Sequence, residues 1–199
     1  CNMSLKGIPG GGKTKSIIDK IIYLNNQNII KNTLDFLILT FTKNAKNDFL
    51  RKGKLLSDNL FTDKNVKTIH SLSGTIFNKL FGKNSSNLST IVASLLYYLE
   101  SDDQIVDQTG DQIEDQISLN DVACLNDVAC LKKCKVIFVD EAQDISEVQY
   151  KVIKLLSEKL DIYVIMIGDP DQNIYQFQSG SDKYLLEHSD INIQLIYNY

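Results

Sequence analysis

The sequence has no apolar run of about 18 residues, the length that a membrane-spanning helix needs, so we expect no transmembrane segment. Its first residues, Cys1-Asn2-Met3-Ser4, contain neither an initiator methionine nor the apolar core of a secretion signal. This start predicts a piece of a longer, intracellular chain, cytoplasmic or nuclear. With 43% hydrophobic and 23% charged residues, the disordered, collagen and disulfide-scaffold classes are excluded. A length of 199 residues suits one large globular domain or one core with an insertion.

A recognisable metal-binding pattern of cysteines is also missing. Cys124, Cys130 and Cys134 stand in the order C-x5-C-x3-C, which matches no familiar zinc spacing, and both histidines lie far from them in sequence. We therefore expect ordinary reduced thiols, with a metal or cluster site as the less favoured alternative.

Basic residues are missing from one segment, Ser101–Leu131, which carries eight acidic residues and no Lys or Arg. The formal net charge is −4, yet outside this segment 21 basic residues face 17 acidic ones, so a polyanionic partner is not excluded. Within it Asp-Gln recurs four times at a four-residue period, and LNDVAC follows twice in tandem. We expect a tolerated insertion that acts as a mobile linker. A helix with the Asp-Gln pairs on one face is the alternative, which repulsion among the acids disfavours.

Elsewhere, short apolar runs alternate with amphipathic stretches. Near-continuous apolar runs are typical of strands that are buried on both faces. The predicted strands are Phe36–Phe41, Val66–Ile69, Val136–Val139, Ile162–Ile167 and Ile193–Ile196. The predicted helices are Lys13–Leu24, Lys43–Arg51, Ser71–Phe81, Ile91–Leu99 and Ile145–Leu160. This order predicts an α/β fold with a mainly parallel sheet flanked by helices.

A glycine-rich loop precedes the first predicted helix. It matches G-x-x-x-x-G-K-[ST] at every fixed position. Glycines allow backbone N–H groups to turn inward, and the helix N-terminus adds positive potential, so such a loop suits a polyphosphate. We expect Lys13 to reach the β- and γ-phosphates and Thr14 to bind Mg²⁺. An ordinary turn before a helix is the alternative. The expected nucleotide-binding residues are Gly7, Ile8, Pro9, Gly10, Gly11, Gly12, Lys13, Thr14 and Lys15.

Two acidic residues, Asp140 and Glu141, directly follow the strand predicted at Val136–Val139. The carboxyl ends of parallel strands face the ligand crevice of α/β proteins. We expect Asp140 to hold Mg²⁺ through its water shell and Glu141 to orient and deprotonate the attacking water. Acidic residues also occur at the start of many helices, where the helix dipole alone stabilises them. The combination of Asp140 and Glu141 with the glycine-rich loop nevertheless favours an ATPase.

A polar loop follows the strand predicted at Ile162–Ile167 and reads GDPDQNIYQF. Gln172 is placed to sense the γ-phosphate, and Tyr175 and Phe177 are placed to offer aromatic faces to nucleobases. The alternative is a simple turn whose aromatic residues pack in the core.

Taken in order, these motifs resemble the first motor domain of superfamily 1 DNA helicases of the UvrD/Rep type. The resemblance rests on GIPGGGKT for motif I, LTFTKNAKNDF for Ia, KTIHSL for Ib, VDEAQD for II and GDPDQNIYQF for III. Residues 195–199 resemble the start of motif IV. The resemblance implies that residues 1–199 are an incomplete first RecA-like domain. In it, residues 82–131 replace or reduce the usual accessory domain.

The same resemblance implies roles for further residues. Phe41 and Phe177 match positions on which single-stranded bases stack, and Tyr199 matches a tyrosine that packs on adenine. Gln172 matches the glutamine that couples the γ-phosphate to DNA. The complete set expected near DNA is Thr40, Phe41, Thr42, Asn44, His70, Tyr175 and Phe177. Phe177 and Gln178 stand where the family usually has tryptophan and arginine, so one DNA contact is expected to be lost.

We therefore predict the ATP-binding motor domain of a DNA helicase that translocates on single-stranded DNA and unwinds duplex. Its cofactors are ATP and Mg²⁺, and its partners are single-stranded DNA and a second RecA-like domain of the same full-length chain. The 3′→5′ polarity comes from the family alone. Two alternatives stay open: another P-loop phosphotransferase, and a degenerate P-loop domain retained for DNA or protein binding.

Overall fold

A six-stranded, all-parallel sheet forms the centre of the molecule. The computed structural model describes residues 3–7, 12–57, 59–81, 88–100, 129–172, 184 and 191–195. The strands are β1 (Met3–Gly7), β2 (Phe36–Thr40), β3 (Val66–Thr68), β4 (Val136–Val139), β5 (Tyr163–Gly168) and β6 (Ile191–Leu195). Their order across the sheet is β3-β2-β4-β5-β1-β6, so β1 lies between two strands from the C-terminal half of the chain. The predicted α/β class is confirmed.

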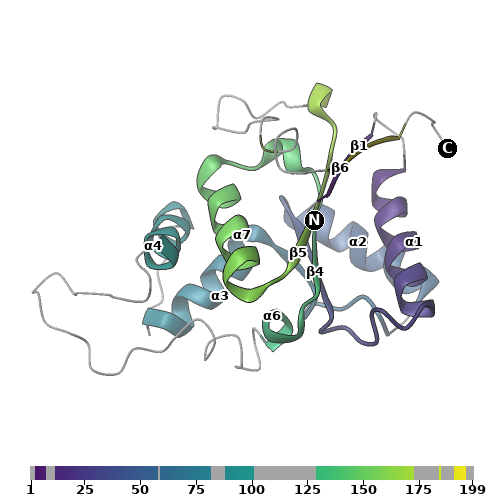
Figure 1. Cartoon of the computed structure of the whole chain (residues 1–199), viewed down its shortest axis with the longest axis horizontal. Coiled ribbons are helices and arrows are strands. Elements are labelled where there is room, and N and C mark those ends of the chain that lie inside the picture. The colour runs from purple at the N-terminus through teal and green to yellow at the C-terminus, as the bar shows by residue number, and fades with distance from the viewer. Residues whose placement is uncertain are drawn as a thin grey trace, which may run out of the picture.

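Helices cover both faces of the sheet (Figure 1). The helices are α1 (Lys13–Asn26), α2 (Lys43–Leu56), α3 (Ile69–Phe81), α4 (Leu88–Glu100), α6 (Ala129–Lys133) and α7 (Glu147–Leu160), with short 3-10 turns η1 (Ala142–Asp144) and η2 (Pro170–Gln172). Figure 1 shows α1 and α2 on one face and α3, α4 and α7 on the other. Each face has its own apolar cluster: Ile17, Ile21, Phe49 and Phe61 belong to the first, and Leu72, Leu95 and Leu156 to the second.

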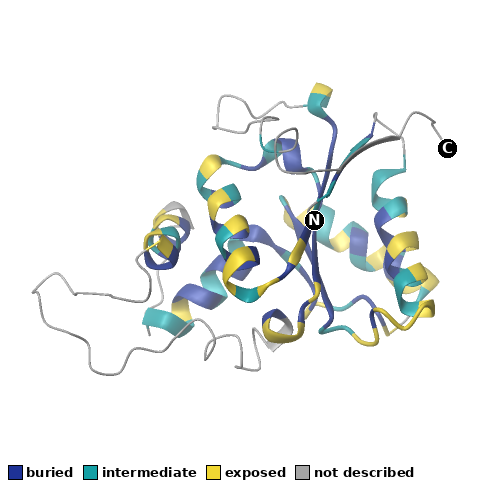
Figure 2. Ribbon diagram, in the orientation of Figure 1, coloured by how far each residue is buried: buried dark blue, intermediate teal, exposed yellow. Residues whose placement is uncertain are grey.

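The apolar runs become the central strands because both of their faces are covered. All residues of β2 and β4 are buried, which Figure 2 shows as a dark band through the middle of the molecule. A strand that buries both faces gains hydrophobic stabilisation along its whole length, so its sequence does not alternate between apolar and polar residues. These two strands therefore hold the residues that follow them in fixed positions.

Polar side chains define where two of the helices begin. Thr42 caps α2, where its side chain accepts a hydrogen bond from the Ala45 N–H at 3.1 Å. Ser146 and Gln149 form a reciprocal capping box at the start of α7. Several predicted boundaries differ from the observed ones, most visibly at α2, which continues to Leu56 instead of ending at Arg51. Ile69 opens α3 instead of ending β3, because Thr68 accepts a hydrogen bond from the Ser71 N–H, and Ile145 lies outside α7, before its Ser146 cap.

Part of the segment predicted to be an insertion belongs to the core. Helix α4 lies within residues 82–131 and packs against α3 and α7, with Val92, Leu95 and Leu99 buried. The repetitive residues 101–128 lie outside the described residues, as do Ile8, Pro9, Gly10, Gly11, Tyr175, Phe177 and Tyr199. Among the described residues, no helix is long and apolar enough to cross a membrane.

Candidate functional site

The carboxyl end of β1 leads into the phosphate-loop residues. Gly7 ends the strand, and Gly12 precedes α1 with φ 72° and ψ 20°, a left-handed conformation that glycine adopts at little cost. The Lys13 ammonium donates to the Gly7 carbonyl at 3.3 Å and lies 3.9 Å from a carboxylate oxygen of Asp169. The Lys13 side chain is 10% exposed and that of Asp169 only 2%. The lysine is therefore held across the ends of β1 and β5.

Asp140 stands at the end of β4 with its carboxylate buried. Its backbone N–H donates to the Leu39 carbonyl at 2.8 Å, which fixes it to the neighbouring strand. One carboxylate oxygen, Oδ1, is buried and has no hydrogen-bond partner among the described residues. Burial, and then the negative charge of Glu141, raise the pKa of Asp140 to about 7, while Lys13 and Lys52 oppose this shift. A buried acidic oxygen without a partner fits a site that a cation satisfies when bound.

Glu141 is held by a buried glutamine that the sequence analysis did not identify. Glu141 has φ 51° and ψ 46°, a left-handed conformation that is strained for a residue with a side chain. Gln143, which is 2% exposed, donates from Nε2 to Glu141 Oε2 at 2.8 Å and accepts from the Asp169 N–H at 3.0 Å. Gln143 thus joins the ends of β4 and β5. Gln143 is part of the VDEAQD motif, but its hydrogen bonds to Glu141 and Asp169 depend on how β4 and β5 pack, which the sequence does not show.

Asp169 is the point at which the remaining polar groups meet. It follows β5, and its Oδ2 accepts a hydrogen bond from Gln172 Nε2 while also facing Lys13. Its Oδ1 accepts from the Asp171 N–H at 3.1 Å. The side chain of Gln172, in η2, is therefore oriented through the same carboxylate that faces the phosphate-loop lysine. Sequence reasoning assigned Gln172 but not Asp169.

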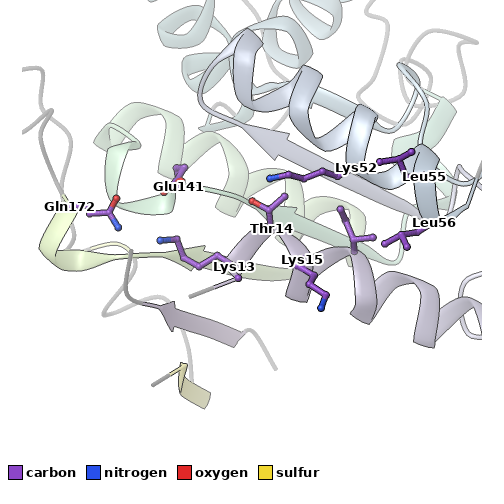
Figure 3. A pocket seen from close by; sticks show the side chains of 10 residues that line it. Lys13, Thr14, Lys15, Lys52, Leu55, Leu56, Glu141 and Gln172 are labelled. Carbon is purple, nitrogen blue, oxygen red and sulfur yellow. The ribbon is translucent and has the colours of Figure 1, made fainter. Parts of the chain in front are cut away.

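Part of this set lines a cavity of about 580 Å³, whereas Asp140, Gln143 and Asp169 are not among the residues that line it. Six of the predicted site residues line it: Gly12, Lys13, Thr14 and Lys15 at the start of α1, Glu141 after β4 and Gln172 after β5 (Figure 3). The full lining is Gly12, Lys13, Thr14, Lys15, Ile18, Lys52, Leu55, Leu56, Glu141 and Gln172.

One wall of this cavity belongs to α2 and was not predicted. Figure 3 shows the Lys52 side chain extending from α2 toward Thr14 and Glu141, with Leu55 and Leu56 farther along the helix. The Lys52 ammonium lies 2.6 Å from Asp48 Oδ2 on the same helix. No motif marks Lys52, because only the packing of α2 beside α1 brings it to the cavity.

Those residues expected near DNA that the structure describes lie at the same edge of the sheet, where β2 and β3 end. Asn44 is exposed, and Phe41 and His70 are half-buried, so all three present some surface. Thr40 does not: it is fully buried, and its hydroxyl faces the carbonyls of Thr42 and Lys67 at 3.2 and 3.4 Å. Its position fits the support of the segment after β2 and not a direct contact, which corrects the expectation for this residue.

The fold and the site together define a nucleotide-binding α/β domain, and comparison with known proteins identifies its family. The AAA domain family matches residues 1–178, so the chain belongs to this family. The UvrD/Rep-type resemblance inferred from the motifs is confirmed by the relatives that follow, and a nucleotide is the ligand class that such a domain uses.

The chain is 28% identical over 193 residues to a candidate ATP-dependent DNA helicase of Acanthamoeba polyphaga mimivirus, a match that covers 96% of this chain and 25% of that protein. It is 45% identical over 49 residues to the ATP-dependent DNA helicase Rep of Buchnera aphidicola subsp. Baizongia pistaciae, which covers 25% of this chain and 7% of that protein. The crystal structure of the Pif1 helicase from Candida albicans shares the fold, with a TM-score of 0.52, 12% identity, and coverage of 100% of this chain and 36% of that one. The chain thus spans about a quarter of the mimivirus protein's length.

Proposed function

We propose that this chain is the ATP-binding motor domain of an ATP-dependent DNA helicase that translocates on single-stranded DNA. The observation that carries the proposal is the convergence of Lys13, Thr14, Glu141 and Gln172 on one cavity at the carboxyl edge of a parallel sheet. The names of its relatives, which are ATP-dependent DNA helicases, support the same activity.

The phosphates of the nucleotide are bound by groups from two helices. Lys13 exchanges its contacts with Gly7 and Asp169 for the β- and γ-phosphates, and the N–H groups at the start of α1 add positive potential. Lys15 and Lys52 line the same cavity and increase its attraction for a polyanion. Lys52 extends toward Thr14 and Glu141 (Figure 3), and we expect it to approach the terminal phosphate of the nucleotide.

The residues present fit a magnesium ion, with Thr14 and Asp140 as the groups that would hold it. The unpartnered buried oxygen of Asp140 is the structural observation in favour of this assignment. When bound, Mg²⁺ neutralises the charge on the β- and γ-phosphates during transfer. Until then, the raised pKa of Asp140 shows that the chain itself satisfies this carboxylate poorly.

Hydrolysis requires a base that is oriented toward the terminal phosphate. Glu141 takes this role, and Gln143 fixes one of its carboxylate oxygens, which leaves the other to orient a water molecule. Gln172 hydrogen bonds to Asp169 in the structure and would turn to the γ-phosphate when ATP arrives. Because Asp169 also faces Lys13, release of both partners by the same event would connect phosphate binding to the loop after β5.

Single-stranded DNA would cross the edge where β2, β3 and β5 end. Phe41 offers a stacking surface there, and Thr42, Asn44 and His70 lie close to the expected backbone path. Tyr175 and Phe177 extend this set by sequence. Stacking is worth roughly 1–3 kcal/mol per base and tolerates any sequence, as translocation requires. The polarity, 3′→5′, follows the UvrD/Rep resemblance.

A motor of this type needs a second half, which we propose to be a RecA-like domain of the same full-length, intracellular chain. In this arrangement residues 1–199 are the first domain, and residues 82–131 stand where the usual accessory domain is inserted. Arginine fingers contribute about 10³–10⁵ to the rate in related phosphoryl transfer. Arg51 is the chain's only arginine, and it is 66% exposed and paired with Asp48 on α2. We therefore expect the 199 residues alone to bind Mg·ATP weakly and to hydrolyse it very slowly.

The decisive experiment measures ATP hydrolysis by the full-length protein with and without single-stranded DNA, beside a Glu141→Gln variant. Stimulation by DNA that is lost in the variant supports the motor. ATP binding without any response to DNA would contradict it and would favour a phosphotransferase or a degenerate binding domain. Glu158→Gln, which removes the same charge from an exposed position on α7 outside the cavity lining, is the matched control and is expected to leave the stimulation unchanged.

A further inference from the structure

The amide of Gln149 has a fixed orientation. This residue lies in the first turn of α7 and is 5% exposed. Its Oε1 accepts a hydrogen bond from the Ser146 backbone N–H at 2.9 Å. An NH₂ group cannot accept that hydrogen, so the two ends of the amide cannot be exchanged. The donor end, Nε2, must therefore point away from the helix cap.

That donor end faces a histidine. Nε2 of Gln149 lies 3.4 Å from Nε2 of His70, which follows β3. Because the amide nitrogen can only donate, Nε2 of His70 must accept and carry no proton. Burial lowers the pKa of His70, which keeps the ring neutral near pH 7. A neutral imidazole has one N–H, and here it must be at Nδ1.

We propose that Gln149 is a positioning residue that fixes the tautomer of His70, so that the ring presents its Nδ1–H as a donor to a phosphodiester oxygen of single-stranded DNA. The inference rests on the proposed function, which places His70 near the DNA backbone. The ring is half-buried, so part of it stays open to a ligand. In the opposite tautomer Nδ1 would direct a lone pair at the phosphate and would repel it.

This arrangement ties the DNA edge to the ATP site. Helix α7 follows Asp140, Glu141 and η1 directly in sequence, and its capping box holds Gln149 in place. Movement of the segment after β4 would therefore change the donor that faces His70. The capping glutamine has two roles, one at the helix terminus and one at the DNA edge.

The tautomer can be measured directly. The chain has two histidines, so ¹⁵N NMR of histidine-labelled protein gives two sets of ring signals, and a His188→Ala variant assigns them. We expect wild-type His70 in the Nδ1–H form. Gln149→Met removes the donor and is expected to abolish this preference. Gln149→Glu keeps the capping box, since glutamate serves there equally, but offers His70 an acceptor and should move the proton to Nε2. A wild-type ring protonated at Nε2, or an unchanged Nδ1–H form in Gln149→Met, would overturn the inference.

A second experiment measures the affinity of the full-length protein for a labelled oligothymidine by fluorescence anisotropy. His70→Ala is expected to reduce affinity about fivefold, the factor that about 1 kcal/mol gives. Gln149→Met should lose a similar factor in the wild-type background and nothing further in the His70→Ala background, because both act through one hydrogen bond. Fully additive losses would overturn the inference. A full-length wild-type protein that binds no oligothymidine at all would instead refute the proposed function, while the NMR result still decides the role of Gln149.

Discussion

Gly53, on α2, packs so closely against Phe61 that a single methyl group at this position is expected to destabilise the protein. A Cβ built on Gly53 would overlap Cγ of Phe61 and would lie 2.7 Å from its Cδ2 and 2.8 Å from its Cβ. The Phe61 ring is fully buried and packs edge-on against Phe36 in β2, at 5.9 Å between ring centroids. Because the ring's own base is among the contacted atoms, a rotation of the side chain cannot relieve the overlap.

Two effects of opposite sign decide the magnitude for Gly53→Ala. Alanine in place of glycine inside a helix is ordinarily favourable by ~0.5–1 kcal/mol. Overpacking a core costs ~1–3 kcal/mol, and the short distances place this case at the upper end. A net loss of about 2 kcal/mol follows, which for a chain of this size lowers the midpoint of thermal unfolding by ~4–8 °C.

Gly74 provides the matched control, because it is a helical glycine in α3 with no atom within 4 Å of an added Cβ. Gly74→Ala is expected to raise the unfolding midpoint by ~1–4 °C. Circular dichroism melts of the two variants should therefore shift in opposite directions. A displacement of α2 also moves Lys52 at the cavity, so only Gly53→Ala should weaken nucleotide binding. An increase in the unfolding midpoint for both variants would contradict the close contact between Gly53 and Phe61.

Three other changes test the site. Gln143→Ala removes the hydrogen bond that orients Glu141 and is expected to lower ATP turnover in the full-length protein by ~10-fold or more. This loss is part of the ~10²–10⁴ that a positioned base contributes to the rate. An equal loss of nucleotide affinity in a fluorescence titration would contradict a positioning role. Lys52→Gln is expected to weaken binding of a non-hydrolysable ATP analogue by about tenfold and of ADP much less, whereas Lys54→Gln, exposed on the same helix and outside the cavity lining, should change neither. In metal-free buffer Asp140 should make the free energy of unfolding fall as pH rises from about 4 to 7, because its raised pKa lets the folded state keep a proton that the unfolded state has released. Burial also raises the pKa of Asp144 to about 6 and adds to this slope, so urea melts of Asp140→Asn should show a reduced slope, and an unchanged slope would contradict the assignment.

Much of the fold was predictable because its determinants are local. The strand at Val136–Val139 was predicted with its observed bounds, since four apolar residues followed by two acids leave little choice of where a buried strand ends. Helix α1 was predicted from its first residue, because Gly12 and Lys13 mark the change from loop to helix. Boundaries set by a cap were less certain from sequence. Ser146, and not Ile145, decides where α7 begins, because it is the residue whose side chain accepts from the Gln149 N–H.

The order of the strands lay beyond local reasoning. Strand β4 pairs with β2, and β1 lies between β5 and β6, although β4 is far from β2 in sequence and β1 is far from both of its neighbours. This order depends on which faces the helices cover and how the crossovers pack. The same packing explains why α4, within a segment expected to be an insertion, became part of the core through Leu95 and Leu99.

For the candidate site, the sequence by itself determined which catalytic and binding groups we predicted. The tertiary structure decided which neighbouring residues hold those groups in place. The roles of Lys13, Thr14, Asp140, Glu141 and Gln172 could be proposed from the sequence because each follows a strand end, where parallel strands direct ligand-binding groups to one edge. The bridge from Gln143 to Asp169, the approach of Lys52 and the contact of Gln149 with His70 could not, since each joins residues from different elements. A motif records residue types at a fixed spacing along the chain. Hydrogen bonds between the motif residues and the side chains around them depend on distances in space, which only the packed sheet and helices determine.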